Sequence, residues 1–162
     1  MIDYAFYVKL LILAALLFIF IYYLIKQYIE KQKKHKRRKA FISSNMAAVD
    51  NMSGIDFEHY LEALFHKRGY QSVVTKGSHD FGADLIMKSD RKKIVIQAKR
   101  SKAKISIKAV MEIYAAKAYY RADEAYVFTN SYYTKSAKEL AEATGVYLCD
   151  REDIIKMRNK IS

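Results

Sequence analysis

The chain divides, by its pattern of apolar and polar positions, into one unbroken apolar stretch and a later region of short periodic segments. Residues 10–25 are all Leu, Ile, Ala, Phe or Tyr, and Lys9 is the only charge between Tyr4 and Ile25. A helix needs about 20 apolar residues to cross a bilayer. This stretch therefore predicts a membrane-spanning helix in which Lys9 extends to the nearby surface.

The segments after residue 52 alternate between helical and strand-like apolar periods, which predicts an α/β fold. Helices are expected after the cap residues Ser53 and Asp150, from Ser106 to about Tyr120, and from Thr134 to Ala143. The expected strands are 71–76, a pair flanking residues 89–92, and then 125–129 and 146–149. Helices between the later strands imply crossover connections. The pattern therefore predicts a mixed sheet covered by helices on both faces, in the order αβββαβαβ plus a terminal helix.

The strand pair flanking residues 89–92 is expected to form a hairpin. If Asp90 and Arg91 are the centre of the turn, residues pair where their numbers sum to 181. Asp84 then faces Gln97. Side chains alternate between the faces of a strand, so Gln97 shares one face with Lys99, while the other face of the hairpin is apolar throughout. Directly opposed side chains have Cβ atoms roughly 5 Å apart, within reach of a shared ion.

An acid, an amide and an ammonium on one face suggest a metal site. Two oxygen donors, from Asp84 and Gln97, suit a hard cation such as Mg²⁺, with Lys99 near the water or phosphate that the metal activates. The alternative is that Gln97 and Lys99 are solvated residues on the exposed face of an edge hairpin. The two strands alone leave both interpretations open.

Several motifs, in order along residues 52–157, carry a family resemblance. They are Gly54-Ile-Asp-Phe57-Glu58, Gly69-Tyr70, His79-Asp80-Phe-Gly82-Ala-Asp84, Gln97-Ala-Lys99-Arg100 and Thr129-Asn-Ser-Tyr-Tyr133-Thr134-Lys-Ser-Ala137. Together they resemble the catalytic domain of Mrr-like restriction endonucleases, within the PD-(D/E)xK nucleases. The resemblance implies a restriction-endonuclease-like fold and a Mg²⁺-dependent deoxyribonuclease of the type IV restriction kind. It also implies catalytic roles for Asp84, Gln97 and Lys99, with Gln97 in a position that is usually Glu or Gln in the family and is Gln in its Mrr branch.

Two further acidic residues have competing interpretations. Glu58, on the first helix after residue 52, either compensates the helix dipole or approaches the metal site as a catalytic residue, as an acid on this helix often does in the nucleases that the chain resembles. Asp80 either bonds its own backbone in a turn, which we favour, or makes an accessory metal or DNA contact. His79 is expected to be an ordinary loop histidine, since no second histidine lies at ligand spacing.

Candidate DNA contacts follow the proposed site in two places. Arg100, Lys102, Lys104 and Lys108 form a basic run that begins at the site and could hold a phosphodiester backbone. Residues 129–131, which are Thr129, Asn130 and Ser131, lie where a strand ends and a loop begins, a common position for functional residues. Such a basic run is otherwise an ordinary solvated face.

The net charge of +12 is concentrated next to the apolar stretch. Residues 26–39 hold eight lysines or arginines against one glutamate, a net +7. Basic residues that follow an apolar helix fix it as an uncleaved anchor and bind anionic lipid, whereas a signal peptide has its basic residues before the apolar core. We therefore expect a single-pass cell-membrane protein with its catalytic domain in the cytoplasm. The single cysteine, Cys149, excludes an intramolecular disulfide and a zinc cluster.

The expected domain organisation is an anchor at residues 1–25, a basic juxtamembrane segment and linker at 26–52, and a nuclease domain at 53–162. The expected function is a membrane-anchored DNA endonuclease that restricts foreign or modified DNA. Two alternatives stay open: a catalytically weak tether that holds DNA at the membrane, and a resolvase that cuts branched DNA. DNA, the membrane and a second copy in a homodimer are the expected partners.

Overall fold

The computed structural model describes residues 4–75 and 81–159. It divides into two compact units, Met1–Arg37 and Arg38–Ser162. The first unit belongs to the long helix α1 (Tyr4–Ser43), which has no buried residue. By length and composition, α1 is the one helix in the described part of the chain that could cross a membrane.

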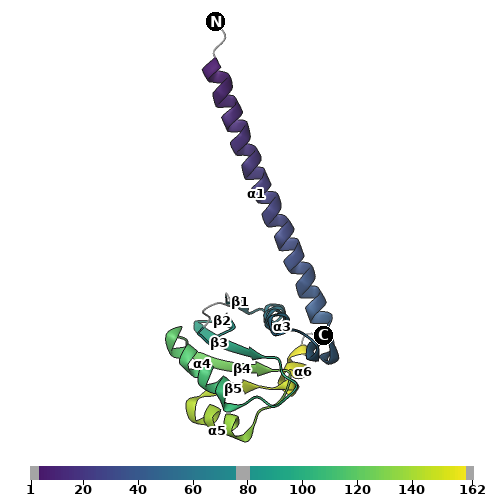
Figure 1. The fold of residues 1–162 in the computed structure, drawn as a ribbon, viewed down its shortest axis with the longest axis vertical. Helices are drawn as coiled ribbons and strands as arrows, with labels where there is room; N and C mark the ends of the chain where they lie inside the picture. The colour runs from purple at the N-terminus through teal and green to yellow at the C-terminus, as the bar shows by residue number, and fades with distance from the viewer. Residues whose placement is uncertain (1–3, 76–80, 160–162) are drawn as a thin grey trace. The chain divides into compact units, whose positions relative to one another are not determined.

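The second unit is a five-stranded mixed sheet with helices on both faces, as the sequence predicts (Figure 1). Its strands lie in the order β1-β2-β3-β4-β5, antiparallel up to β3 and parallel from β3 to β5. The strands are β1 (Gln71–Val74), β2 (Leu85–Ser89), β3 (Lys92–Lys99), β4 (Glu124–Thr129) and β5 (Val146–Cys149). The helices are α2 (Met46–Asp50), α3 (Gly54–Lys67), α4 (Ile107–Tyr119), α5 (Lys135–Thr144) and α6 (Arg151–Asn159).

Local sequence signals place the ends of these helices. The Ser53 side chain accepts a hydrogen bond from the Asp56 N–H at 3.1 Å and donates one to the Asp56 carboxylate at 2.7 Å, so it caps α3 as predicted. Thr134 caps α5 in the same way through the Ala137 N–H. Gly145 ends α5 with a φ of 67°, a left-handed conformation that glycine adopts without strain.

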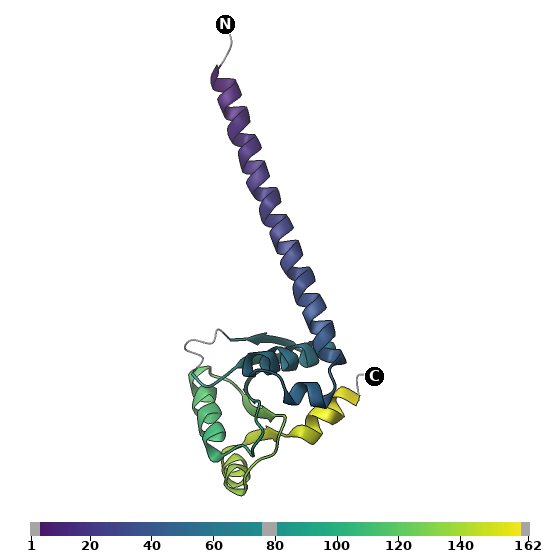
Figure 2. The same cartoon turned by 45° about the vertical axis from the view of Figure 1, so that its right-hand side comes forward.

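The sheet separates two apolar cores. On one face, α3, α2 and α6 supply residues such as Leu61, Val49 and Ile154, which pack on Leu85 and Ile96. On the other face, α4 and α5 pack on a second set of buried side chains that includes Val95 and Val127. Figure 2 shows α2, in dark blue, beside the yellow α6. Both faces of the β2–β3 hairpin are therefore covered along most of β3.

By helical spacing alone, the large apolar residues Ile107, Val110, Met111 and Tyr114 would lie together on one side of α4. Val110 faces the core, but Met111 and Tyr114 are exposed. The buried positions are Ala109, Val110, Ile113 and Ala116. Small alanines let the helix axis approach the sheet closely, and this packing, more than the size of the apolar residues, sets the rotation.

Residues 38–52, expected as part of a linker, belong to the folded unit, which begins at Arg38 and not at residue 53. Val49 is fully buried in the core, and Phe41 and Met46 pack against it. The Arg38 guanidinium lies 3.4 Å from a carboxylate oxygen of Glu62, which is itself buried. The break between α1 and α2 falls at the polar residues Ser44 and Asn45.

Candidate active site

The β2–β3 hairpin has the predicted register. Leu85 pairs with Ile96 and Ser89 with Lys92, so the paired numbers sum to 181. Asp84 lies just before β2, where its N–H donates to the Ile96 carbonyl at 2.9 Å. Its Oδ2 accepts a hydrogen bond from the Ala98 N–H at 2.7 Å. These two bonds fix Asp84 beside the strand residue between them, which is Gln97.

Gln97 is buried, with only 2% of its surface exposed. Its Nε2 donates a hydrogen bond of 2.8 Å to Oε2 of Glu112, a residue of α4. Its Oε1 is buried and has no hydrogen-bond partner among the described residues. The solvated-face interpretation is therefore wrong for Gln97, because α4 covers this face of β3.

Lys99, two residues further along β3, also contacts Glu112. Its Nζ lies 3.2 Å from Oε2 of Glu112, and both side chains are about a third exposed. The Nζ of Lys108, one turn before Glu112 on α4, lies 3.8 Å from the other carboxylate oxygen. Burial by itself raises the pKa of Glu112, but the hydrogen bonds from Gln97 and Lys99 outweigh it and hold that pKa below its usual value.

The donor set fits a hard divalent cation. A buried amide oxygen without a protein partner is rare in folded proteins, and such an atom commonly accepts from an ordered water or binds an ion. Oε1 of Gln97 is such an oxygen, and the Asp84 carboxylate lies beside the same strand segment. Within residues 4–75 and 81–159, no three His, Cys, Asp or Glu side chains come together to hold a metal. Glu58, half-buried on α3, therefore does not complete a three-carboxylate site, and its catalytic role stays a prediction.

Two of the three residues predicted to contact DNA after β4 are buried inside the protein. Thr129 and Asn130 are buried, with 0% and 4% of their surface exposed. The Thr129 hydroxyl donates to the Lys99 carbonyl at 2.6 Å. The Asn130 amide accepts from the Ser101 N–H and donates to Asp50 of α2. These side chains join the ends of two parallel strands, so the structure gives them a structural role, and direct DNA contact by them stays untested.

The predicted basic run lies partly at the surface. Lys102 and Lys104 are exposed, Lys108 strongly so, and Arg100 is half-buried. Lys102 and Ser131 line a polar hollow of about 420 Å³ next to Asn130 and Arg151. Contact of this run with a phosphodiester backbone stays a prediction, and Asp80 and His79 lie outside the described residues.

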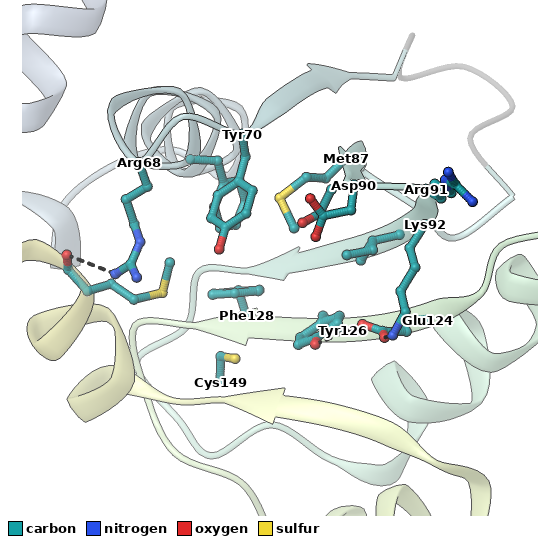
Figure 3. A pocket seen from close by; sticks show the side chains of 14 residues that line it. Arg68, Tyr70, Met87, Asp90, Arg91, Lys92, Glu124, Tyr126, Phe128 and Cys149 are labelled. Carbon is teal, nitrogen blue, oxygen red and sulfur yellow. Dashed lines mark hydrogen bonds and ion pairs between the residues drawn. The ribbon is translucent and has the colours of Figure 1, made fainter.

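A larger hollow of about 630 Å³ lies on the α3 side of the sheet (Figure 3). The end of α3 contributes Arg68, which donates to the Met157 carbonyl at 3.4 Å, and β4 contributes the rings of Tyr126 and Phe128. The hairpin turn forms one of its walls. None of the predicted catalytic residues lines it, so the site and this hollow are separate.

The Mrr_cat family, described as restriction endonuclease, matches residues 49–158, which is more than half of the chain. The chain belongs to the Mrr_cat restriction endonuclease family. Nucleases of the PD-(D/E)xK group, to which Mrr_cat domains are assigned, typically use a divalent metal ion. The match covers the whole sheet and the three residues that contact the Glu112 carboxylate, Gln97, Lys99 and Lys108, so the family membership and the hairpin site concern the same unit.

Two solved structures share the fold of the Mrr_cat unit. The DNA modification-dependent restriction endonuclease AspBHI has a TM-score of 0.57 and 17% identity, over 77% of this chain and 36% of AspBHI. AF1548, a protein of unknown function, has a TM-score of 0.50 and 18% identity, over 57% of this chain and 55% of AF1548. The chain thus spans about a third to a half of these proteins. No curated protein sequence matches it significantly.

Sequence reasoning missed Glu112, although one signal pointed to it. Glu112 is the only acidic residue between Asp90 and Asp123, in a stretch that contains the whole predicted basic run. A lone carboxylate among so many cations is expected to pair with one of them. Its partner could not be identified without the rotation of α4.

Proposed function

We propose that the chain is a membrane-anchored DNA endonuclease that hydrolyses phosphodiester bonds with Mg²⁺ and restricts foreign or modified DNA. The observation that carries the proposal is the buried, unpartnered Oε1 of Gln97, on a strand segment that Asp84 contacts and that carries Lys99 two residues further on. Membership of a restriction endonuclease family supports DNA as the substrate.

Each of the three side chains has a separate task in this proposal. Asp84 and Oε1 of Gln97 would hold the cation, because carboxylate and amide oxygens are ligands that Mg²⁺ accepts. The chemistry that a bound divalent cation supplies is activation of a water and neutralisation of charge on the phosphate. The Lys99 ammonium stabilises negative charge that develops on the phosphate. Lys102 and Ser131 position the DNA backbone, with the other exposed lysines of the run.

Cleavage assays on the purified chain test the proposal. We expect Mg²⁺-dependent cutting of DNA, compared across linear unmodified, linear modified and four-way-junction substrates. Preference for modified duplex supports restriction, whereas preference for the junction favours a resolvase. DNA binding without any metal-dependent cutting, under conditions in which the fold is intact, would overturn the endonuclease proposal in favour of a tether.

The membrane part of the proposal rests on α1 and on the basic run that follows its apolar stretch. A reporter fused after residue 45 is expected to be cytoplasmic, and an external reporter would contradict the orientation. Removal of residues 1–37 should release a folded nuclease into the soluble fraction, because the compact unit begins at Arg38. A full-length protein that is already soluble would exclude the anchor.

We also propose that the nuclease acts as a homodimer, since two active sites can cut the two strands of a duplex in a single binding event. Light scattering on residues 38–162 with and without DNA measures the oligomeric state. A monomer that nicks only one strand would exclude the dimer and leave the chemistry of the single site unchanged.

A further inference from the structure

We infer that Glu112 is a positioning residue that turns the Gln97 amide so that its oxygen faces the metal position, and that holds the Lys99 ammonium beside it. The inference rests on the proposed function and deepens it. It names the source of a second carboxylate in a site whose motif position is occupied by a neutral glutamine.

The two ends of the Gln97 amide differ in what they can bind. An ionised carboxylate only accepts hydrogen bonds, so it must face the NH₂ end of a glutamine. Glu112 contacts Gln97 through Nε2 at 2.8 Å, and this leaves Oε1 at the opposite end. Turning the amide by 180° would place its oxygen against the carboxylate, with no hydrogen between them. Glu112 therefore selects the one orientation in which Oε1 is available to a cation.

The position of Glu112 is itself fixed by packing. Its neighbour Ile113 is fully buried, and α4 packs on β3 and β4. The loop that leads to Asp84 approaches the same point, since a Cβ added at Gly82 would lie 3.0 Å from the Glu112 carbonyl oxygen. Gly82 also has a φ of 89°, which favours glycine. The packing of α4 and the close approach of Gly82 to the Glu112 backbone thus hold the Glu112 carboxylate over Gln97.

Charge explains why a glutamine can serve here. In the hairpin alone, Asp84 is the only carboxylate beside Gln97 and Lys99. Glu112 adds a second negative charge from α4, in contact with the amide and with the ammonium at 3.2 Å. The site then contains two carboxylates and a lysine, while Gln97, one of the two residues that would touch the cation, stays neutral. Groups that orient a metal ligand typically change metal affinity by about 10–100-fold when they are removed.

The test compares metal binding in two backgrounds, with full-length protein in detergent micelles and without DNA. Mn²⁺ binding is followed by the loss of the free-ion paramagnetic resonance signal. Glu112→Ala should weaken binding about tenfold or more. Glu112→Gln, which retains an acceptor oxygen for Nε2, should lie closer to the parent. Glu139→Ala on α5 is the matched control, because Glu139 is an exposed helical glutamate paired with Lys135.

The Gln97→Glu background separates positioning from general support of the fold. A carboxylate at residue 97 has two equivalent oxygens and needs no orientation, so adding Glu112→Ala should not weaken Mn²⁺ binding there. Equal weakening in both backgrounds would mean that Glu112 is merely structural and would overturn the inference.

A second measurement works without any metal. The side-chain NH₂ signals of Gln97, assigned by their loss in Gln97→Glu, should shift in Glu112→Ala and stay unchanged in Glu139→Ala. Signals that do not shift would overturn the inference. If the parent neither binds Mn²⁺ nor cuts DNA, the proposed function fails, and the amide signals alone still decide whether Glu112 orients Gln97.

Discussion

Gln97 and Asn130 are both buried amides, and they lie near the ends of neighbouring parallel strands, β3 and β4. Asn130 uses both ends of its amide inside the protein, accepting from Ser101 and donating to Asp50. Gln97 uses only its nitrogen. A satisfied buried amide rigidifies the fold, whereas an unsatisfied one costs stability unless a ligand completes it. The difference separates a structural junction from a candidate site.

Removing the charge next to Gln97 is expected to have the largest effect on activity. Asp84→Asn keeps an acceptor for the Ala98 N–H, so the fold should persist. Metal-dependent cleavage should fall by more than about a hundredfold, since even groups behind a metal ligand reach that range. Cleavage assays on protein with an unchanged unfolding midpoint measure this effect. Cleavage activity close to that of the parent would show that the hairpin has only a structural role.

Two substitutions at Gln97 test whether its Oε1 is a metal ligand. Gln97→Leu removes the unpartnered oxygen at similar size and should abolish metal-dependent cleavage. Gln97→Glu should bind the cation more tightly and lower the Mg²⁺ concentration needed for cutting. Without metal it should be less stable, because it places a carboxylate against Glu112. Leu and Glu variants with the same metal dependence would show that Oε1 is not a ligand.

The sequence predicted the hairpin register better than it predicted contacts between residues that lie far apart in the chain. Local rules sufficed for the register, which follows from a turn centred on Asp90 and Arg91, and for the Ser53 cap. Glu112 was missed because α4 is apolar on most sides, so its rotation depends on how closely alanines fit the sheet. The buried role of Asn130 was missed because its partner, Asp50, lies 80 residues earlier.

Asn130→Ala is expected to produce the opposite effect to the Asp84 and Gln97 substitutions. The substitution leaves the Ser101 N–H without its acceptor and the Asp50 carboxylate without one of its donors. The free energy of unfolding should therefore fall by about 1–3 kcal/mol. Cleavage per folded molecule should change little. Urea unfolding of residues 38–162 and cleavage at saturating DNA measure the two effects. A loss of cleavage as large as that of Asp84→Asn, with stability unchanged, would reverse the two roles.

The smallest expected effect is the loss of stability at low pH through Asp50, which contacts Asn130. The hydrogen bond from Arg151 lowers the pKa of Asp50; burial opposes this, and the bond from Asn130 reinforces it. A lowered folded-state pKa means that the stabilisation is fully present above the unfolded pKa, about 4, and is lost as pH falls through the folded value. Between pH 7 and pH 3, residues 38–162 should therefore lose part of the contribution of Asp50 to the free energy of unfolding.

Asp50→Asn isolates that contribution, because it keeps an oxygen for Arg151 and Asn130 but has no proton to gain. Arg151 contacts Asp50 at 2.6 Å and also donates to the Asn130 carbonyl at 3.1 Å, so the charge of Asp50 supports both. The variant should be less stable than the parent at pH 7, and the difference should narrow at pH 3. Equal pH dependence in the two proteins would show that the Asn130 junction is held by its neutral hydrogen bonds and not by the charge of Asp50.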